Sequence, residues 1–216
     1  MRTILFIAII SMLGMSCTKD RLNADGNITT EVRRPGNFNG VHSSGDNPVT
    51  ITYGTEYKVE IRGSANLVPR YKTEIHNGVI NLGYKHVNVQ NDDIEVFVTL
   101  PGLNKAAMSG SGRLWIDGNF PAQDLFRLSI SGSSETHIRG TFSANELNVD
   151  ISGSGDANLE NILAKKGDIR ISGSGDVRLS IQNTLKARIS GSGKVYYTGN
   201  ATVDSEISGS GQIIKF

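Results

Sequence analysis

The sequence predicts an all-β protein whose chain winds into a single-stranded parallel β-helix, a β-solenoid of right-handed sense. Three observations predict this fold: a short motif recurs at nearly constant spacing, the residues around it alternate between apolar and polar, and the repeat region shows no helical spacing. Alternation with a period of two is typical of half-buried strands. Glycine and β-branched residues also occur where a helix would be penalised.

The N-terminus has the features of a leader for export. Arg2 supplies a positive charge, residues 3–15 are almost wholly apolar, and Ser16 directly precedes Cys17, the only cysteine. This apolar run is too short for a membrane span of about 20 residues, but it is typical of a secretory signal with a lipoprotein cleavage site. We therefore expect residues 1–16 to be a signal peptide and residues 17–28 to comprise a lipidated Cys17 and a tether.

A plain signal peptide with a leftover thiol at Cys17 is the alternative. Gly14 stands where a lipoprotein cleavage site usually has leucine, and Leu13 lies one place too far upstream. An exported protein with one cysteine has no disulfide partner for it, and acylation of the sulfur accounts for both its position and its isolation. We favour the anchored form, in the outer membrane, on its periplasmic face or at the cell surface.

Charge and composition exclude some functions. The whole chain has 22 Lys and Arg against 21 Asp and Glu. Removal of residues 1–16 takes Arg2 and no acidic residue, which leaves the mature chain neutral by count. Nucleic-acid binding needs an excess of basic residues, so we expect none. With 6% aromatic residues and one tryptophan, large aromatic-lined pockets are not expected either.

The repeat carries most of the fold prediction. The motif SGSG begins at Ser109, Ser152, Ser172, Ser190 and Ser208, with SGSS at Ser131, so that successive copies are 22, 21, 20, 18 and 18 residues apart. The residue before each copy is aliphatic, namely Met108, Ile130, Ile151, Ile171, Ile189 and Ile207. A coil of this length cannot bury its inner face alone, so adjacent coils must stack.

Parity across the motif predicts which way its residues point. If alternation is unbroken, both glycines point inward, where a tight bend admits no side chain. Both serines then point outward. Stacked coils would align them into two ladders of hydroxyl groups.

We expect one β-solenoid domain over residues 29–216. Regular coils occupy 105–216, and more irregular coils occupy 29–104. Residues 59–67 look like a shortened copy of the repeat, and residues 41–46 are a fainter echo. A separate N-terminal β-sandwich is the alternative.

The chain resembles a known family. The segments RRPGNFNGVHSSG, ITYGTEYKVEIRGSANL, VINLGY and VFVTLPGLNKAAMSGSG, followed by the ISGSGD units, are similar to the Bacteroidetes family described as "putative auto-transporter adhesin, head GIN domain". The resemblance covers nearly the whole mature chain. It implies an exported β-solenoid, frequently on lipoproteins, with an adhesin role, and it carries over no catalytic or ligand residues.

Asp156 and Asp176 form the most distinctive candidate site. Both follow the motif directly, so stacking places them on adjacent coils about 4.8 Å apart. Such a pair could act as general acid and base in a carbohydrate-active β-helix enzyme, or supply oxygen ligands to calcium. Alternatively, each aspartate completes a turn, and Lys194 on the next coil offsets the repulsion. We favour the turn role, and expect no enzyme activity, metal or cofactor.

The histidines and the serine motif do not change this expectation. His42, His76, His86 and His137 lie in separate segments, without a cysteine or carboxylate at metal-ligand spacing. A serine nucleophile needs a strand-to-helix turn, and the sequence predicts none here.

Other surface features suggest binding. The serine ladders could contact glycans, order water as in ice-binding proteins, or bond to one another. Trp115 is predicted to face outward in the same column as Tyr196, and exposed aromatic rings can stack on sugars. The favoured function is a noncatalytic adhesin or structural module with a glycan or cell-surface protein as ligand. Self-association through an uncapped C-terminal edge is a further hypothesis.

Overall fold

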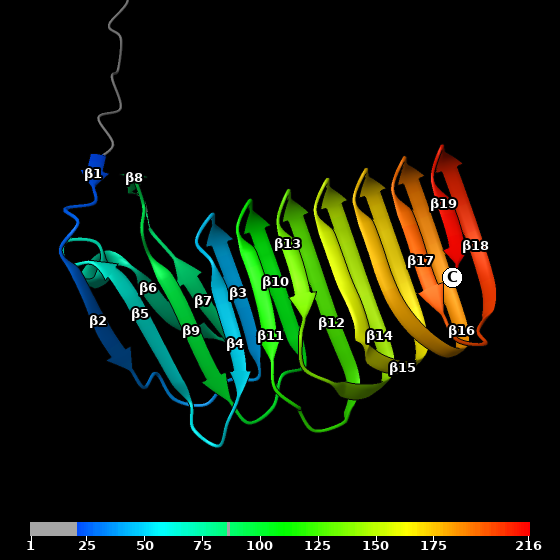
Figure 1. Cartoon of the computed structure of the whole chain (residues 1–216), viewed down its shortest axis with the longest axis horizontal. Coiled ribbons are helices and arrows are strands. Elements are labelled where there is room, and N and C mark those ends of the chain that lie inside the picture. Colours follow the sequence, from blue (N-terminus) through cyan, green and yellow to red (C-terminus); the bar gives the residue numbers. More distant parts are fainter. Residues whose placement is uncertain (1–20, 86) are drawn as a thin grey trace, which may run out of the picture.

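The computed structural model describes residues 21–85 and 87–216, so the predicted signal peptide and Cys17 lie outside the described residues. The described chain is nearly all strand and forms a β-solenoid of about five turns, which confirms the predicted fold class. Its coils stack along the long axis of the molecule, from the blue N-terminal end to the red C-terminal end (Figure 1). Within the described residues, no helix has the length and hydrophobicity to cross a membrane.

The N-terminal elements are short. They are β1 (Arg21–Asn23), β2 (Ile28–Arg33), β3 (Gly40–Gly45), β4 (Val49–Tyr53), β5 (Lys58–Ser64), the 3₁₀ helix η1 (Val68–Arg70), β6 (Lys72–His76), β7 (Val79–Gly83), β8 (Asn88–Gln90) and β9 (Glu95–Leu100).

The C-terminal elements include longer strands that run from one coil into the next. They are β10 (Lys105–Gly110), β11 (Arg113–Asp117), β12 (Gln123–Gly132), β13 (Glu135–Ile138), β14 (Phe142–Gly153), β15 (Asp156–Gly173), β16 (Asp176–Gly191), β17 (Lys194–Thr198), β18 (Thr202–Gly209) and β19 (Gln212–Lys215).

Two faces enclose the core. Each coil passes along a first face, turns at the serine-glycine motif, and returns along a second face. The first face comprises β3, β10, β12, β14, the C-terminal parts of β15 and β16, and β18. The second face comprises β4, β11, β13, the N-terminal parts of β15 and β16, β17 and β19.

The predicted columns are confirmed by the strand register. Met108 pairs with Ile130, and Ile151, Ile171, Ile189 and Ile207 follow in the same column. The serines and glycines of the six motifs align in the same way. Because the register is constant, equivalent side chains of successive coils lie above one another, and each repeated residue forms a ladder along the stack.

The two glycines of each motif have different surroundings. A Cβ on the second glycine, such as Gly175, would meet the Gly155 carbonyl of the neighbouring coil and would also lie 3.0 Å from the Ile151 side chain, as expected for an inward position. The first glycine does not continue the alternation. Gly173 has a φ of +132°, and a Cβ there would lie 2.9 Å from the carbonyl carbon of Gly153 on the neighbouring coil, and closer still to its oxygen. The inward prediction was therefore wrong for the first glycine.

This close approach lets the parallel pairing continue around the corner. The Ser174 amide donates a hydrogen bond to the Gly153 carbonyl at 2.9 Å, and the Ser192 amide donates to the Gly173 carbonyl at the same distance. The first glycine is thus required by contact between coils, in addition to the bend of its own chain.

The N-terminal part differs from the expected succession of coils. β5, which contains most of the stronger apparent echo at residues 59–67, pairs antiparallel with β2 and β9 and is not a solenoid coil. The fainter echo at residues 41–46 does belong to a solenoid coil, because β3 runs parallel to β10, with Gly45 beside Gly110. β7 and β9 stack on the other side of β3 and β4. One sheet therefore continues from this region into the regular coils.

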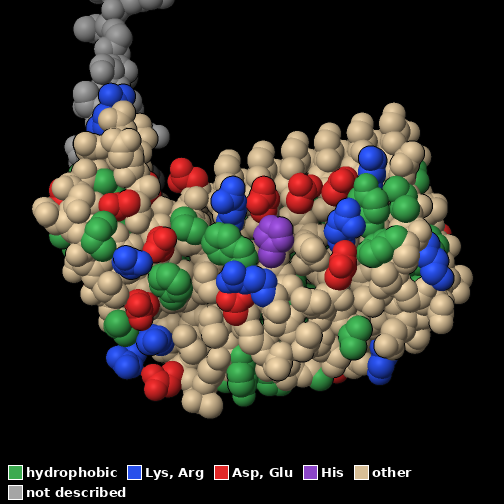
Figure 2. Space-filling view, viewed as in Figure 1, with side chains coloured by type: hydrophobic (Ala, Val, Ile, Leu, Met, Phe, Trp, Pro, Cys, Tyr) green, Lys and Arg blue, Asp and Glu red, His purple; other side chains and the backbone are tan. Residues whose placement is uncertain are grey.

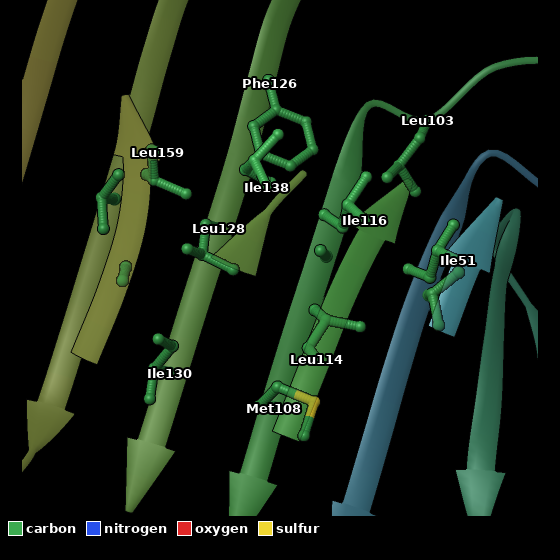
Figure 3. Close-up of a cluster of buried hydrophobic side chains, with 14 of the residues drawn as sticks. Ile51, Leu103, Met108, Leu114, Ile116, Phe126, Leu128, Ile130, Ile138 and Leu159 are labelled. Carbon is green, nitrogen blue, oxygen red and sulfur yellow. The ribbon is translucent and has the colours of Figure 1, made fainter. Parts of the chain in front are cut away.

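The core is one continuous column of apolar side chains between the two faces. Figure 3 shows Leu128 and Ile130 of β12 directed toward the same interior as Leu114 and Ile116 of β11. Ser134 replaces the second glycine in its coil, and it is fully buried with no hydrogen-bond partner for its hydroxyl among the described residues.

A pair of tyrosines packs within the N-terminal region. The Tyr71 and Tyr84 rings meet edge to face, with centroids 5.1 Å apart, and the Tyr84 hydroxyl lies 3.1 Å from a carboxylate oxygen of Asp92. Burial raises the pKa of Tyr71 well above its ordinary value, and burial together with the nearby Asp92 charge raises the pKa of Tyr84. Both side chains therefore stay neutral in the folded protein at physiological pH.

Candidate functional site

A groove of about 600 Å³ follows the first face along the stack. Its lining includes the first serine of all six motifs, together with the aliphatic residue before each of the first five. Five intervals of about 4.8 Å between the six coils give it a length of about 24 Å.

The hydroxyl groups on this groove are largely available to a ligand. In the first ladder, only Ser109 has a side-chain hydrogen-bond partner among the described residues, Nε2 of His42 at 3.0 Å. The remaining members, Ser131, Ser152, Ser172, Ser190 and Ser208, are exposed. The groove thus presents hydroxyl donors and acceptors, while the aliphatic residues before the first five motifs are only 1–2% exposed and point into the core.

Charged residues form a linked network beside the serines. Arg170 lies 2.8 Å from Asp168 and 3.5 Å from Asp150, and Arg188 lies 3.6 Å from Asp168 and 3.7 Å from Glu206. Two basic and three acidic groups are thus interleaved, so the groove presents no strong field of one sign. Its electrostatics suit an uncharged ligand.

The predicted aspartate pair lies on the second face, where each carboxylate contacts the backbone of the next coil. An Asp156 carboxylate oxygen accepts the Asp176 backbone amide at 2.8 Å, and an Asp176 carboxylate oxygen accepts the Lys194 amide at 2.9 Å. Each carboxylate therefore satisfies the backbone of the following coil. Among residues 21–85 and 87–216, no group of three or more His, Cys, Asp or Glu side chains could hold a metal ion.

Trp115 lies on the same face, in a row that runs across the strands. Register places Trp115 beside His137, and the row continues through Asn158 and Arg178 to Tyr196. The Arg139 guanidinium lies 5.5 Å from the centre of the Trp115 ring. Hydrogen bonds of 2.7 and 2.6 Å to Asp117 hold Arg139 there and raise its pKa.

The structure thus brings Asp156, Asp176 and Trp115 onto one face, while Cys17 lies outside the described residues. Figure 2 shows charged side chains in a row along the upper part of this face, acidic in the middle and basic at each end. Sequence reasoning identified the serine ladders but missed the groove beneath them. The signal available was the small serine side chain that follows the aliphatic residue in every copy of the motif.

Comparison with known proteins agrees with this architecture. The family model described as "putative auto-transporter adhesin, head GIN domain" matches residues 37–201, about three quarters of the chain. The chain belongs to this family. The resemblance predicted from the sequence is thereby confirmed, and an adhesin-type family indicates a cell-surface or envelope location.

Solved structures share the fold of this adhesin family member. A protein from Bacteroides fragilis titled "putative adhesin" has a TM-score of 0.70 at 19% identity, with 90% of this chain and 100% of that one covered. A "putative lipid binding protein" from Parabacteroides distasonis has a TM-score of 0.64 at 19% identity, covering 91% and 100%. A "putative adhesin" from Parabacteroides merdae has a TM-score of 0.56 at 21% identity, with 91% of this chain and 99% of that one covered. No curated protein matches the chain.

Proposed function

We propose that this protein is a noncatalytic adhesin, anchored in the outer membrane through Cys17, that binds glycan chains in the groove of its first face. The observation that carries the proposal is the groove itself, which crosses six coils and presents a regular row of exposed serine hydroxyls. A glycan offers hydroxyl groups at every sugar, and the groove offers a row of serine hydroxyls to bond with them.

The arrangement of the second face supports a noncatalytic role. General acid-base catalysis needs a carboxylate free to exchange protons with a substrate. One oxygen of Asp156 and one of Asp176 each accept a backbone amide of the next coil. Asp156 and Asp176 recur one coil apart because the whole motif repeats, as the serines and glycines beside them also do.

Membrane attachment is supported by the sequence around Cys17. If acylation occurs there, a Cys17→Ser variant expressed in the native host moves from the membrane fraction to the soluble fraction. Palmitate labelling of the wild-type chain and not of the variant gives the direct readout. An unlabelled wild-type chain contradicts the anchor.

The groove is tested by glycan-array binding of the full chain, followed by titration with the best-bound glycan. One lost hydrogen bond costs about 1 kcal/mol, so Ser152→Ala and Ser172→Ala each weaken binding about fivefold. The exposed serine Ser143, which lies outside the groove, provides the control, and Ser143→Ala leaves affinity unchanged.

Two results contradict the proposal. Equal affinity in the groove and control variants places the glycan elsewhere. If no glycan on the array binds, a fatty acid binds instead, and Ser152→Leu changes that binding, then the groove is a lipid site.

A further inference from the structure

One row of outward side chains on the second face, called the aromatic row, includes the partly exposed rings of Phe97, Trp115 and Tyr196. The strand register links Glu60 of β5 to Phe97 of β9, Phe97 to Thr50 of β4, and Thr50 to Trp115 of β11. The same row then passes through His137, Asn158, Arg178 and Tyr196. Residues from strands far apart in the sequence therefore form one line along the solenoid axis.

The spacing of the rings suits an extended ligand. Phe97 and Trp115 are two strands apart, or about 10 Å, and Trp115 and Tyr196 are four strands apart, or about 19 Å. Phe97 is 37% exposed and the His137 side chain 44% exposed, while Trp115 and Tyr196 are half-buried. Half-burial of a ring fixes it in place while leaving part of it accessible.

Arginine side chains help to hold two of these rings. The Arg139 guanidinium lies 5.5 Å from the Trp115 ring centre and is fixed in turn by Asp117. The Arg178 guanidinium lies 4.5 Å from the Tyr196 ring centre. Cation–π contacts of this kind stabilise the ring orientation before a ligand arrives.

Hydrogen-bonding groups flank the aromatic row. Two residues earlier on each strand lies a second row, formed by Arg113, Glu135, Asp156, Asp176 and Lys194. Its three central members are consecutive carboxylates. Glu135 lies 3.2 Å from Arg113, and one oxygen each of Asp156 and Asp176 accepts a backbone amide, so the other oxygens are left to accept hydrogen bonds from hydroxyl groups. The aromatic row is thus one side chain wide and has charged groups beside it, unlike the broad desolvated centre of a protein interface.

We propose that this aromatic row is a second binding track, on the opposite face from the groove, for an uncharged, extended glycan. Sugar rings stack on Phe97, Trp115 and Tyr196, and the flanking carboxylates accept their hydroxyl hydrogens. Acidic and basic groups are interleaved along the track, because Arg113 pairs with Glu135 and Arg178 lies in the aromatic row itself, so the track suits an uncharged sugar chain. The track is independent of the serine groove, since no residue of the aromatic row lines that groove.

Trp115 is the only tryptophan in the chain, which makes its fluorescence a site-specific probe. The full chain is titrated with cellohexaose, maltohexaose, mannohexaose and a hyaluronan hexasaccharide. We expect at least one neutral hexasaccharide to shift the Trp115 emission saturably, and hyaluronan to leave it unchanged. A ligand that occupies only the serine groove does not move this signal, so the two proposals fail separately.

Variants locate the track without removing the probe. Phe97→Ala and Tyr196→Ala retain Trp115 and weaken the emission-detected binding at least fivefold. Tyr53→Ala removes a comparably exposed ring, 41% exposed, outside the row and leaves binding unchanged. Circular dichroism checks that each variant is folded. No emission change with any neutral hexasaccharide, or equal affinity in Tyr196→Ala and Tyr53→Ala, overturns the proposal.

Discussion

Replacement of Gly173 by alanine tests the physical basis of the corner. Its φ of +132° is a conformation that side-chain-bearing residues rarely adopt, at a cost of about 1–3 kcal/mol. The added Cβ would lie 2.9 Å from the Gly153 carbonyl carbon and closer to its oxygen. Separation of the two coils to relieve such overpacking costs about a further 1–3 kcal/mol. We therefore expect Gly173→Ala to lower the free energy of unfolding by about 2–6 kcal/mol.

Urea denaturation followed by far-ultraviolet circular dichroism measures this change. The matched control is Gly102→Ala, because a Cβ at Gly102 meets no atom within 4 Å and its φ is not in the positive range. The control is expected to be neutral or slightly stabilising. A Gly173→Ala protein within about 0.5 kcal/mol of wild type would refute the explanation, since ordinary surface substitutions fall in that range.

Four further predictions address the turn, the core, the tyrosine pair and the open end. Asp156→Ala removes the acceptor for the Asp176 amide and lowers the free energy of unfolding by about 1 kcal/mol. Asp156→Asn retains an acceptor, so its urea midpoint should fall less than that of Asp156→Ala. Ser134→Ala deletes a buried hydroxyl without a partner and should raise the thermal midpoint; an unchanged or lower midpoint would count against this. Because the pKa of Tyr71 is raised in the folded protein, its neutral side chain stabilises the fold below pH ~10, and this stability is lost as pH rises because the unfolded chain ionises first. Tyr71→Phe should therefore show a shallower decline in urea midpoint above pH ~10 than wild type. An equal slope in the two proteins would contradict the assignment. Among the described residues β18 has register pairs with β16 only, and Ile207 is 42% exposed there. We therefore expect concentration-dependent self-association by light scattering, which Ile207→Lys reduces. A strictly monomeric chain at high concentration argues against it.

The sequence alone determined the architecture of the C-terminal half. Six motif copies at 18–22 residues, each preceded by an aliphatic residue, require stacked coils because no single coil can bury its own apolar face. The same spacing predicted the serine ladders and the placement of Asp156 and Asp176 on adjacent coils. It favoured a turn role for those aspartates, and in the structure each accepts a backbone amide of the next coil.

Only the tertiary structure shows which strands become neighbours, and several features of the protein depend on that pairing. Local similarity favoured residues 59–67 as a coil, yet β5 pairs antiparallel with β2 and β9, because register is set by partners from elsewhere in the chain. The direction of Gly173 toward the adjacent coil follows from φ, which the repeat pattern does not encode. The groove and the row from Phe97 to Tyr196 exist only once separate strands are aligned, since each strand contributes a single side chain to the row.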